Sequence, residues 1–328
     1  MQRRQFLGFG LASIAAAATG TPARSQAAFP SRPIKLVVPF SAGGVNDIVG
    51  RQWAEKVKNS LGTVYVENMG GAGGTLGVME VKRAEADGHT ILFGGTSTMV
   101  LHEMTMSNLA YDPTKDFVPI AIFCVTTTSI AVNASLPVKN IKELIDYAKA
   151  NSGKLSYGSA GTGTMSHLAG ELFKQITGLK DLVHVPYKGA GPGIADLISG
   201  HIPMMSPNVS NQILNFYRTG KIRVLAVNAP SRLKGAPEIP TAIEQGVPNM
   251  VGQLFQGIYV RAGTPNATIE RIASATRTVM SDAAFEKILV DSGFEPVSYY
   301  GAESGLRYMS EERARWKPVV EAIGLKVR

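Results

Sequence analysis

Two segments of this chain share one plan, in which a short run of β-forming residues leads through a glycine-rich loop into an amphipathic helix. In the first segment, residues 34–38 form the run and residues 41–44 form the loop. In the second, residues 155–158 precede a loop at residues 159–163. A strand that feeds a helix in this way is typical of α/β proteins, so the repeat predicts two similar lobes.

Strands and helices alternate along the rest of the chain. Further β-rich runs predict strands at residues 64–66, 90–93, 118–123, 129–132, 182–185, 223–227 and 257–260. Helical periodicity predicts helices at residues 75–84, 140–150, 190–199, 266–279, 282–292 and 302–321. This alternation predicts an α/β fold in which each lobe is a mostly parallel sheet flanked by helices.

The chain is expected to cross between the lobes twice, near residues 125 and 251. The first crossing follows the strand that ends at Phe123, and the second returns the C-terminal helices to the first lobe. The first lobe would then hold residues 28–124 and 252–328, and the second lobe residues 125–251. No linker rich in Ser, Pro or charge separates them, so the crossings are expected to be strand-like, as in a hinged clamp.

Residues 1–27 have the composition of an export signal. They contain no acidic residue and continue from Arg3-Arg4 into an alanine-rich apolar run at residues 6–18, shorter than the roughly 20 residues of a membrane-spanning helix. Small residues at Ser25 and Ala27 predict cleavage after Ala27. The segment resembles a twin-arginine signal, so the mature chain is expected in the periplasm. An N-terminal amphipathic helix is the alternative.

Charge and hydropathy exclude several kinds of partner. The formal net charge of +8 falls to +5 without residues 1–27, which carry three arginines and no acid. This mild positive balance suits a small anionic ligand. No later window holds 18 uninterrupted apolar residues, and no basic run is interleaved with aromatic residues. Neither a transmembrane helix nor a nucleic-acid partner is therefore expected.

No residue pattern indicates a metal or a cofactor. The single cysteine, Cys124, excludes an intrachain disulfide and a cysteine-based zinc cluster. The histidines never occur in H-x-x-x-H or H-E-x-x-H spacing. A third glycine loop, at residues 70–74, fails the dinucleotide pattern because Leu76 stands where the last glycine should be.

The two strand–loop–helix units are candidate anion sites. A glycine loop presents unpaired N–H groups beside the positive end of a helix dipole. Two such loops that face each other across a cleft could hold one small anion from both sides. Asp47 cannot donate when ionised and is interpreted as ordering its loop. The polar side chains near the loops that could contact ligand oxygens are Ser41, Asn46, Ser159, Thr162, Thr164 and Ser166.

A catalytic function is the alternative to ligand binding. His167 lies just inside the second helix and could reach the cleft, or it could be a buried, hydrogen-bonded histidine. A periplasmic hydrolase or isomerase would use Ser159 and His167. The chain has no G-x-S-x-G elbow, however, because Gly158-Ser159-Ala160-Gly161 has the wrong spacing. No catalytic residue is therefore assigned, and the protein is expected not to be an enzyme.

Ordered motifs along nearly the whole mature chain resemble one known family. The opening motif is Pro39-Phe40-Ser41-Ala42-Gly43-Gly44 with Asp47 and Arg51. The further matches follow in order along the chain. They are Glu67-Asn68, residues 71–74, Asp87-Gly88-His89-Thr90, Tyr111-Asp112-Pro113, residues 115–117, residues 158–163, residues 167–169, residues 184–189, Pro240-Thr241 and residues 262–265. The series is similar to the Bug or tricarboxylate-receptor family, the extracytoplasmic solute receptors of tripartite tricarboxylate transporters.

The resemblance implies a type II periplasmic binding protein fold, in which two α/β lobes close on a small carboxylate in the interlobe cleft. It implies that the protein delivers this ligand to integral membrane transporter subunits; presentation to a membrane sensor kinase is the alternative. A monomer without a cofactor is expected. Loops 40–44 and 159–163 would hold one carboxylate, while Thr96, Ser97 and residues 206–210 would contact the other end. The candidate ligand-binding residues are Phe40, Ser41, Gly43, Gly44, Asp47, Thr96, Ser97, Ser159, Gly161, Thr162, Gly163, His167 and Asn208.

The chain departs from the family pattern at several positions. Pro207 stands where relatives can place an aspartate that contacts the ligand. Proline supplies neither a carboxylate nor an N–H, so an amino-acid ligand that needs a partner for its ammonium is disfavoured. Phe255 replaces a common tryptophan and Arg261 a usual proline, and neither change alters the expected fold.

Overall fold

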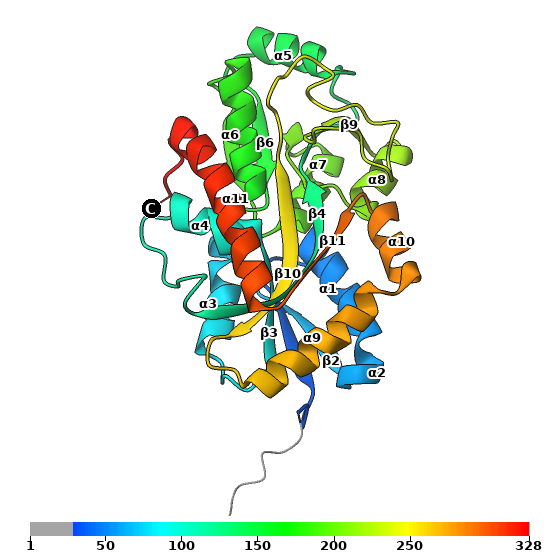
Figure 1. The fold of residues 1–328 in the computed structure, drawn as a ribbon. Coiled ribbons are helices and arrows are strands. Elements are labelled where there is room, and N and C mark those ends of the chain that lie inside the picture. The colour runs from blue at the N-terminus through cyan, green and yellow to red at the C-terminus, as the bar shows by residue number, and fades with distance from the viewer. Residues whose placement is uncertain (1–28, 328) are drawn as a thin grey trace, which may run out of the picture.

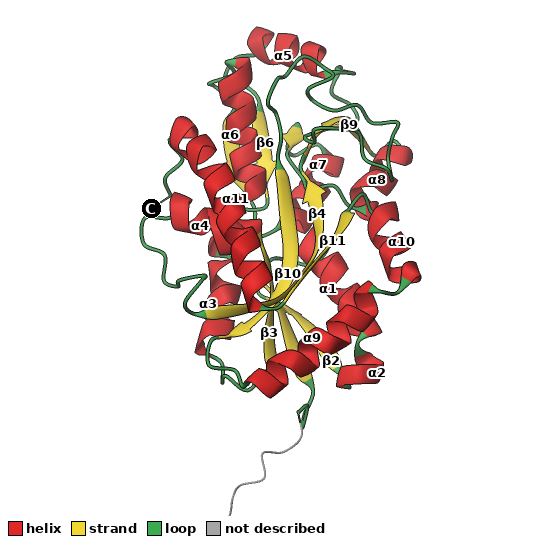
Figure 2. Ribbon diagram, viewed as in Figure 1, coloured by secondary structure: helices red, strands yellow, loops and turns green. Residues whose placement is uncertain are grey.

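The computed structural model describes residues 29–327, and the predicted export signal with its cleavage site lies outside them. Two sheets, each flanked by helices, make up the described chain (Figures 1 and 2). Among the described residues, no helix is long and apolar enough to cross a membrane.

The helices and strands follow the predicted alternation closely. In chain order they are β1 (Ile34–Val38), α1 (Val45–Lys56), α2 (Lys58–Leu61), β2 (Val64–Asn68), the 3₁₀ turn η1 (Ala72–Gly74), α3 (Thr75–Arg83), β3 (Thr90–Gly95), the π-helical turn η2 (Ser97–Leu101), α4 (His102–Thr105), β4 (Phe117–Thr127), β5 (Ser129–Asn133), α5 (Ile141–Ala150), β6 (Ser156–Ser159), α6 (Met165–Thr177), β7 (Val183–Pro186), α7 (Ala190–Ser199), β8 (Met204–Met205), α8 (Asn211–Arg218), β9 (Ile222–Val227), β10 (Gln253–Arg261), α9 (Asn266–Met280), α10 (Ala283–Asp291), β11 (Glu295–Tyr300) and α11 (Ala302–Ile323). The sequence patterns did not predict α2, η1, η2, α4, β8, α8 or β11.

The first sheet has the strand order β11-β4-β10-β3-β1-β2. β1 pairs in parallel with β2 and β3, whereas β10 pairs antiparallel with β3 on one side and with β4 on the other. β11 pairs antiparallel with β4, so β1 to β4 run in one direction and β10 and β11 run against them. The expectation of mostly parallel strands holds for direction, but the hydrogen-bonded ladders of β10 and β11 are antiparallel.

The second sheet repeats this plan with the order β7-β6-β8-β5-β9. β6 pairs in parallel with β7 and β8, and β5 pairs antiparallel with β8 and β9. β6 with α6 thus corresponds in position to β1 with α1. The repeated strand–loop–helix unit of the sequence is therefore a repeat of the fold.

One reversed strand in each sheet, β10 in the first and β5 in the second, carries the chain across from the other sheet. The chain leaves the first sheet after Thr127 and returns at Gln253. Beside these crossings, the N–H of Thr128 donates to the carbonyl of Gly252 at 2.8 Å, and the N–H of Asn228 donates to the carbonyl of Thr128 at 2.8 Å. The structure therefore has extended, paired crossings, while the lobe boundaries at residues 125 and 251 stay predictions.

Helix α11 connects the two halves of the fold a second time. It follows β11 of the first sheet, and in Figure 1 it rises beside α6 of the second sheet. Trp316 and Val320 of α11 are buried in one apolar cluster with Met165 and Leu168 of α6. This packing holds the start of α6 in the same apolar cluster as Val37 and Tyr259 of the first sheet.

Candidate ligand-binding site

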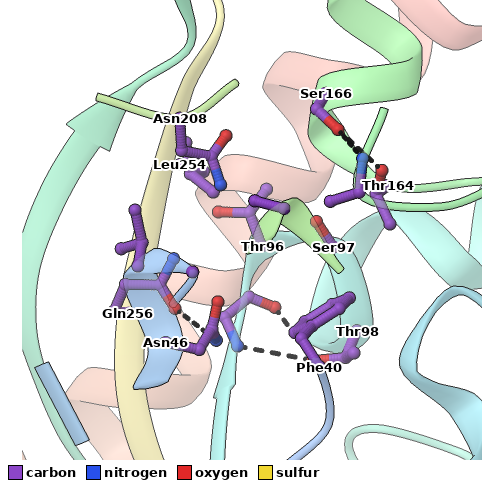
Figure 3. Close-up of a pocket in the computed structure, with 15 residues that line it drawn as sticks. Phe40, Asn46, Thr96, Ser97, Thr98, Thr164, Ser166, Asn208, Leu254 and Gln256 are labelled. Atoms are coloured by element: carbon purple, nitrogen blue, oxygen red, sulfur yellow. Dashed lines mark hydrogen bonds between the residues drawn. The ribbon is translucent and has the colours of Figure 1, made fainter. Parts of the chain in front are cut away.

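A cavity lies between the two sheets, and the space inside it, with the solvent at its mouth included, is about 420 Å³. The residues that line it come from both sheets and are all uncharged (Figure 3). They are Phe40, Gly44, Val45, Asn46, Gly95, Thr96, Ser97, Thr98, Ala160, Thr164, Ser166, Ala190, Asn208, Leu254 and Gln256.

The first glycine loop joins β1 to α1 and faces the cavity with its two ends. Phe40 and Gly44 line the cavity, whereas Ser41 points across to the other half of the fold. The Asp47 carboxylate accepts from the N–H of Gly43 at 3.0 Å and from Nε of Arg51 at 2.8 Å. Asp47 therefore orders the loop, as the sequence interpretation proposed, and it does not line the cavity.

The second glycine loop joins β6 to α6 and approaches the cavity from the opposite side. Ala160, Thr164 and Ser166 line the cavity. The Ser166 hydroxyl accepts from the N–H of Ala160 at 2.8 Å, and the N–H of Met165 donates to the Ser97 hydroxyl at 3.0 Å. Ser97 belongs to η2, so this last bond joins the start of α6 to the first half of the chain.

A stacked pair of histidine rings, neither of which lines the cavity, supports the second glycine loop. The rings of His167 and His184 lie 3.8 Å apart with an interplanar angle of 8°. Nδ1 of His167 accepts from the N–H of Gly163 at 3.1 Å. Burial lowers the pKa of His167 to about 4 and that of His184 to about 3. Both rings are therefore neutral near pH 7 and hold the loop by hydrogen bonds and stacking.

The alternative of a catalytic pair between Ser159 and His167 does not match the observed contacts. The Ser159 hydroxyl lies 2.6 Å from Nε2 of His184 and accepts from the N–H of Gly161 at 3.1 Å. Ser159 is fully buried and does not line the cavity. These contacts shape the loop.

Five of the thirteen candidate ligand-binding residues line the cavity: Phe40, Gly44, Thr96, Ser97 and Asn208. The other eight support the walls or lie in loops beside them: Ser41, Gly43, Asp47, Ser159, Gly161, Thr162, Gly163 and His167. Lining residues that the sequence analysis did not name are Val45, Gly95, Thr98, Ala190, Leu254 and Gln256, while Ala160 appeared only as part of the second loop. The sequence signal that could have indicated Gln256 as a cavity residue is a polar glutamine within the largely apolar run of β10.

The amino ends of two helices converge on the cavity. α1 begins at Val45 and α6 at Met165, one from each half of the fold. Among the described residues, no group accepts a hydrogen bond from the N–H of Asn46 or of Ser166. Unpaired N–H groups and the positive ends of two helix dipoles favour an anion in this position. The described residues hold no cluster of three or more His, Cys, Asp or Glu side chains suited to a metal ion.

This fold and cleft define a two-lobed periplasmic binding protein. Solved structures with similar folds include the periplasmic binding protein BugD, with a TM-score of 0.86 and 31% identity over 91% of this chain and 100% of that chain. A second is Rpa4515 from R. palustris with adipate, with a TM-score of 0.86 and 29% identity over 91% of this chain and 99% of that one. MatC from Rhodopseudomonas palustris with bound malate has a TM-score of 0.83 and 29% identity over 89% of this chain and 100% of that one.

Sequence comparison identifies the family. Residues 49–325 match the model of the tripartite tricarboxylate transporter family receptor. The protein BugT of Bordetella pertussis is 29% identical over 319 residues, which span 96% of both chains. A protein encoded in the tcbD–tcbE intergenic region of Pseudomonas sp. strain P51 is 34% identical over 94% of this chain and 92% of its own. The chain belongs to the tripartite tricarboxylate transporter receptor family and is a solute-binding protein.

Proposed function

We propose that this protein captures a small carboxylate in the cavity between its sheets and delivers it to the membrane subunits of a tripartite tricarboxylate-type transporter. The observation that carries the proposal is the convergence of the α1 and α6 amino ends on one uncharged cavity. The adipate and malate bound to two similar structures support this class of ligand.

The ligand carboxylate would lie against the hydroxyl-rich wall of the cavity. Ser97, Thr164 and Ser166 lie there, next to the unpaired N–H of Ser166. Hydrogen bonds to a charged group contribute roughly 1.5 to 3 kcal/mol each, so three or four could support micromolar binding after ordering costs. An arginine or lysine in the cavity is not required. The two glycine loops would act chiefly by shaping these walls, with Phe40, Gly44 and Ala160 in direct contact with the ligand.

Ligand capture would be coupled to closure of the two halves. The cavity walls come from both sheets, so a ligand between them makes its full set of contacts only when the halves are together. A ligand that binds one conformation better shifts the equilibrium toward that conformation. The transporter would then distinguish the loaded, closed receptor from the empty one.

The protein would be exported to the periplasm, and it would release its ligand chemically unchanged. The chain would carry a twin-arginine signal at residues 1–27, lose it after Ala27 and act as a periplasmic monomer. Ser159 is buried in contact with His184, which supports a structural role for this hydroxyl. The relatives that are periplasmic binding proteins support the same compartment and a receptor rather than an enzyme.

Thermal unfolding against a ligand panel tests this function. The chain from Ala28 onward, unfolded and refolded to remove carried-over ligand, would be heated with mono-, di- and tricarboxylates, amino acids and uncharged analogues. A ligand at a hundredfold excess over its Kd stabilises the folded state by about 2.7 kcal/mol. A higher Tm with some carboxylates, together with recovery of the unchanged compound, supports the receptor. No shift with any carboxylate, or conversion of the compound, contradicts it.

A further inference from the structure

A buried histidine, His102, lies where the two halves of the fold meet. It is the first residue of α4, in the first half of the chain, and its side chain is fully buried. A Cβ atom at Gly73 of η1 would lie 3.4 Å from Nε2 of His102, and one at Gly163 of the second glycine loop would lie 3.7 Å from Cδ2. The same edge of the ring therefore faces a loop of each half.

The end of α4 contacts the second glycine loop as well. A Cβ atom at Gly163 would lie 3.3 Å from Oγ1 of Thr105 and 3.4 Å from Cε of Met106. These contacts seat the loop of the second half over α4. Separation of the two halves would draw the loop away and admit water to the ring edge of His102.

The hydrogen bonds of the His102 ring define its tautomer. The Tyr111 hydroxyl donates its single proton to the carbonyl oxygen of Thr98 at 2.6 Å. The same hydroxyl oxygen lies 2.7 Å from Nδ1 of His102, so it accepts from an N–H at Nδ1. Nε2 of the neutral ring is then a bare acceptor, and it is buried without a hydrogen-bond partner among residues 29–327.

A positive charge on this ring has neither an acceptor nor water to stabilise it in the closed conformation. Protonation places an N–H at Nε2, where no described group accepts it, and an unpaired buried charge is costly. Burial accordingly lowers the pKa of His102 to about 4 from 6.5. The structure therefore favours the neutral ring over a wide range of pH.

The charged residues on the surrounding elements are engaged elsewhere. The η1 and η2 turns and residues 159–164 contain none. Glu103 of α4 pairs with Arg313 of α11, Asp112 pairs with Lys115, and Lys326 is exposed. The other titratable groups nearby are the Tyr111 hydroxyl and His167, whose Nδ1 accepts from the N–H of Gly163.

We propose that His102 is a positioning residue for ligand capture, because the two halves close over it only when its ring is neutral. In the open conformation, water donates to Nε2 of the neutral ring or accepts from the N–H of the protonated ring. Closure removes this water, so a protonated ring must release its proton before the halves meet. The inference rests on the proposed function, since it takes closure around the ligand as given.

Ligand affinity should therefore fall as the pH falls below the ordinary pKa of histidine. The pKa of His102 would be near 6.5 in the open conformation and is about 4 in the closed one. Between these two values, protonation of the open conformation competes with closure. The apparent Kd should rise about tenfold between about pH 7.5 and pH 5.5.

Calorimetry on the wild type and on His102→Asn measures this pH dependence. Asparagine keeps a donor for the Tyr111 hydroxyl, lacks Nε2 and does not titrate. The probe is malate or adipate, the compounds bound to two similar structures, or otherwise the carboxylate of the panel with the largest rise in Tm. Titration of the probe itself affects both proteins equally, so the tenfold difference should appear only in the wild type.

His201→Asn is the matched control, because His201 is an exposed histidine of the second half. It should keep the pH profile of the wild type. Parallel pH profiles for the wild type and His102→Asn overturn the inference.

Titration of the histidine rings by NMR tests the exposure of His102 directly. Without ligand, His102 should show a pKa near 6.5, and with saturating probe it should show no titration above about pH 5. A pKa below about 5 in the ligand-free wild type contradicts the inference. This measurement decides the question even where His102→Asn fails to fold.

The outcomes separate this inference from the proposed function. Binding of a carboxylate with parallel pH profiles contradicts the role of His102 and leaves carboxylate capture standing. Failure of every carboxylate in the panel to bind contradicts both.

Discussion

Ser41 and Lys188 lie 147 residues apart in the chain, and the N–H and the hydroxyl of Ser41 both donate to the carbonyl oxygen of Lys188, at 3.1 and 3.0 Å. This contact joins the first glycine loop to the segment before α7 in the other half of the fold. Around it, glycines bring backbone against backbone. A Cβ atom at Gly70 would overlap the Lys188 carbonyl, and one at Gly73 would overlap the Thr162 carbonyl. We call these contacts, together with Gly191 against Ala42, the closure seam.

The closure seam predicts that one added methyl group holds the halves apart. Gly191 lies inside α7, and a Cβ there would overlap the carbonyl oxygen of Ala42. Gly191→Ala should weaken ligand binding about tenfold or more, because only the closed conformation suffers the overlap. Alanine is about 1 kcal/mol better than glycine inside a helix, so the ligand-free protein should not lose stability.

Calorimetry gives the affinity of this variant, and small-angle scattering with saturating ligand gives its compactness. Ser199→Ala is the control, because Ser199 is an exposed residue of the same helix. Wild-type affinity and compactness for Gly191→Ala would contradict the closure seam.

The two glycine loops predict loss of binding on branched substitution. Gly43 has φ +85° and Gly161 has φ +134°, values that a β-branched residue adopts only with strain. A Cβ at Gly161 would also lie 3.0 Å from the Tyr187 carbonyl oxygen. Gly43→Val and Gly161→Val should therefore each abolish the ligand-induced rise in Tm while far-UV circular dichroism still shows a folded chain. A normal ligand-induced rise in both variants would remove the two-loop description of the site.

A hydrogen bond at Ser97 joins the two halves of the fold, and we expect ligand binding to depend on it. Its hydroxyl accepts from the N–H of Met165, the first residue of α6. Ser97→Ala leaves that buried N–H without an acceptor, a cost of about 1 to 3 kcal/mol in the closed conformation. A cost of this size corresponds to a rise in Kd of about five- to hundredfold, which is the result we expect. Thr241→Ser, remote from the cavity, is a control for general loss of stability, and an unchanged Kd for Ser97→Ala would contradict the link.

Three buried histidines predict a fall in stability at mildly acid pH. Burial lowers the pKa of His102 and His167 to about 4 and that of His184 to about 3, from 6.5. The unfolded chain therefore binds more protons than the folded chain below about pH 6.5. Their stabilising contribution is complete above that pH and is lost as the pH falls toward 4 and below.

Thermal unfolding from pH 8 to pH 4 measures this dependence. Glu171 and Lys174 lie beside the His167–His184 pair, and a His184→Gln variant keeps both while removing one titrating ring. Its Tm should fall less steeply between pH 6.5 and pH 4 than that of the wild type. Parallel curves for the two proteins would show that His184 does not contribute to the acid sensitivity.

Much of the fold followed from patterns between residues that are near each other in the chain. β1, its glycine loop and α1, and the matching unit of β6 and α6, depend on strand-forming runs, φ-permissive glycines and helical spacing. The reversed strands were not predicted, because direction within a sheet depends on which strand a distant segment pairs with. The short strand β8 was missed for a related reason, since two residues carry no periodicity.

The sequence alone determined that two α/β halves would each present a glycine loop and a helix amino end, because these features arise from local backbone preferences. Tertiary structure decided which side chains meet in the cavity. Gln256 reaches it because β10 pairs antiparallel with β3 and places Gln256 opposite Gly95. Asn46 and Gln256 then bond across 210 residues of chain. Such contacts depend on the register of strands and the packing of both sheets, and no local pattern in the sequence encodes that register.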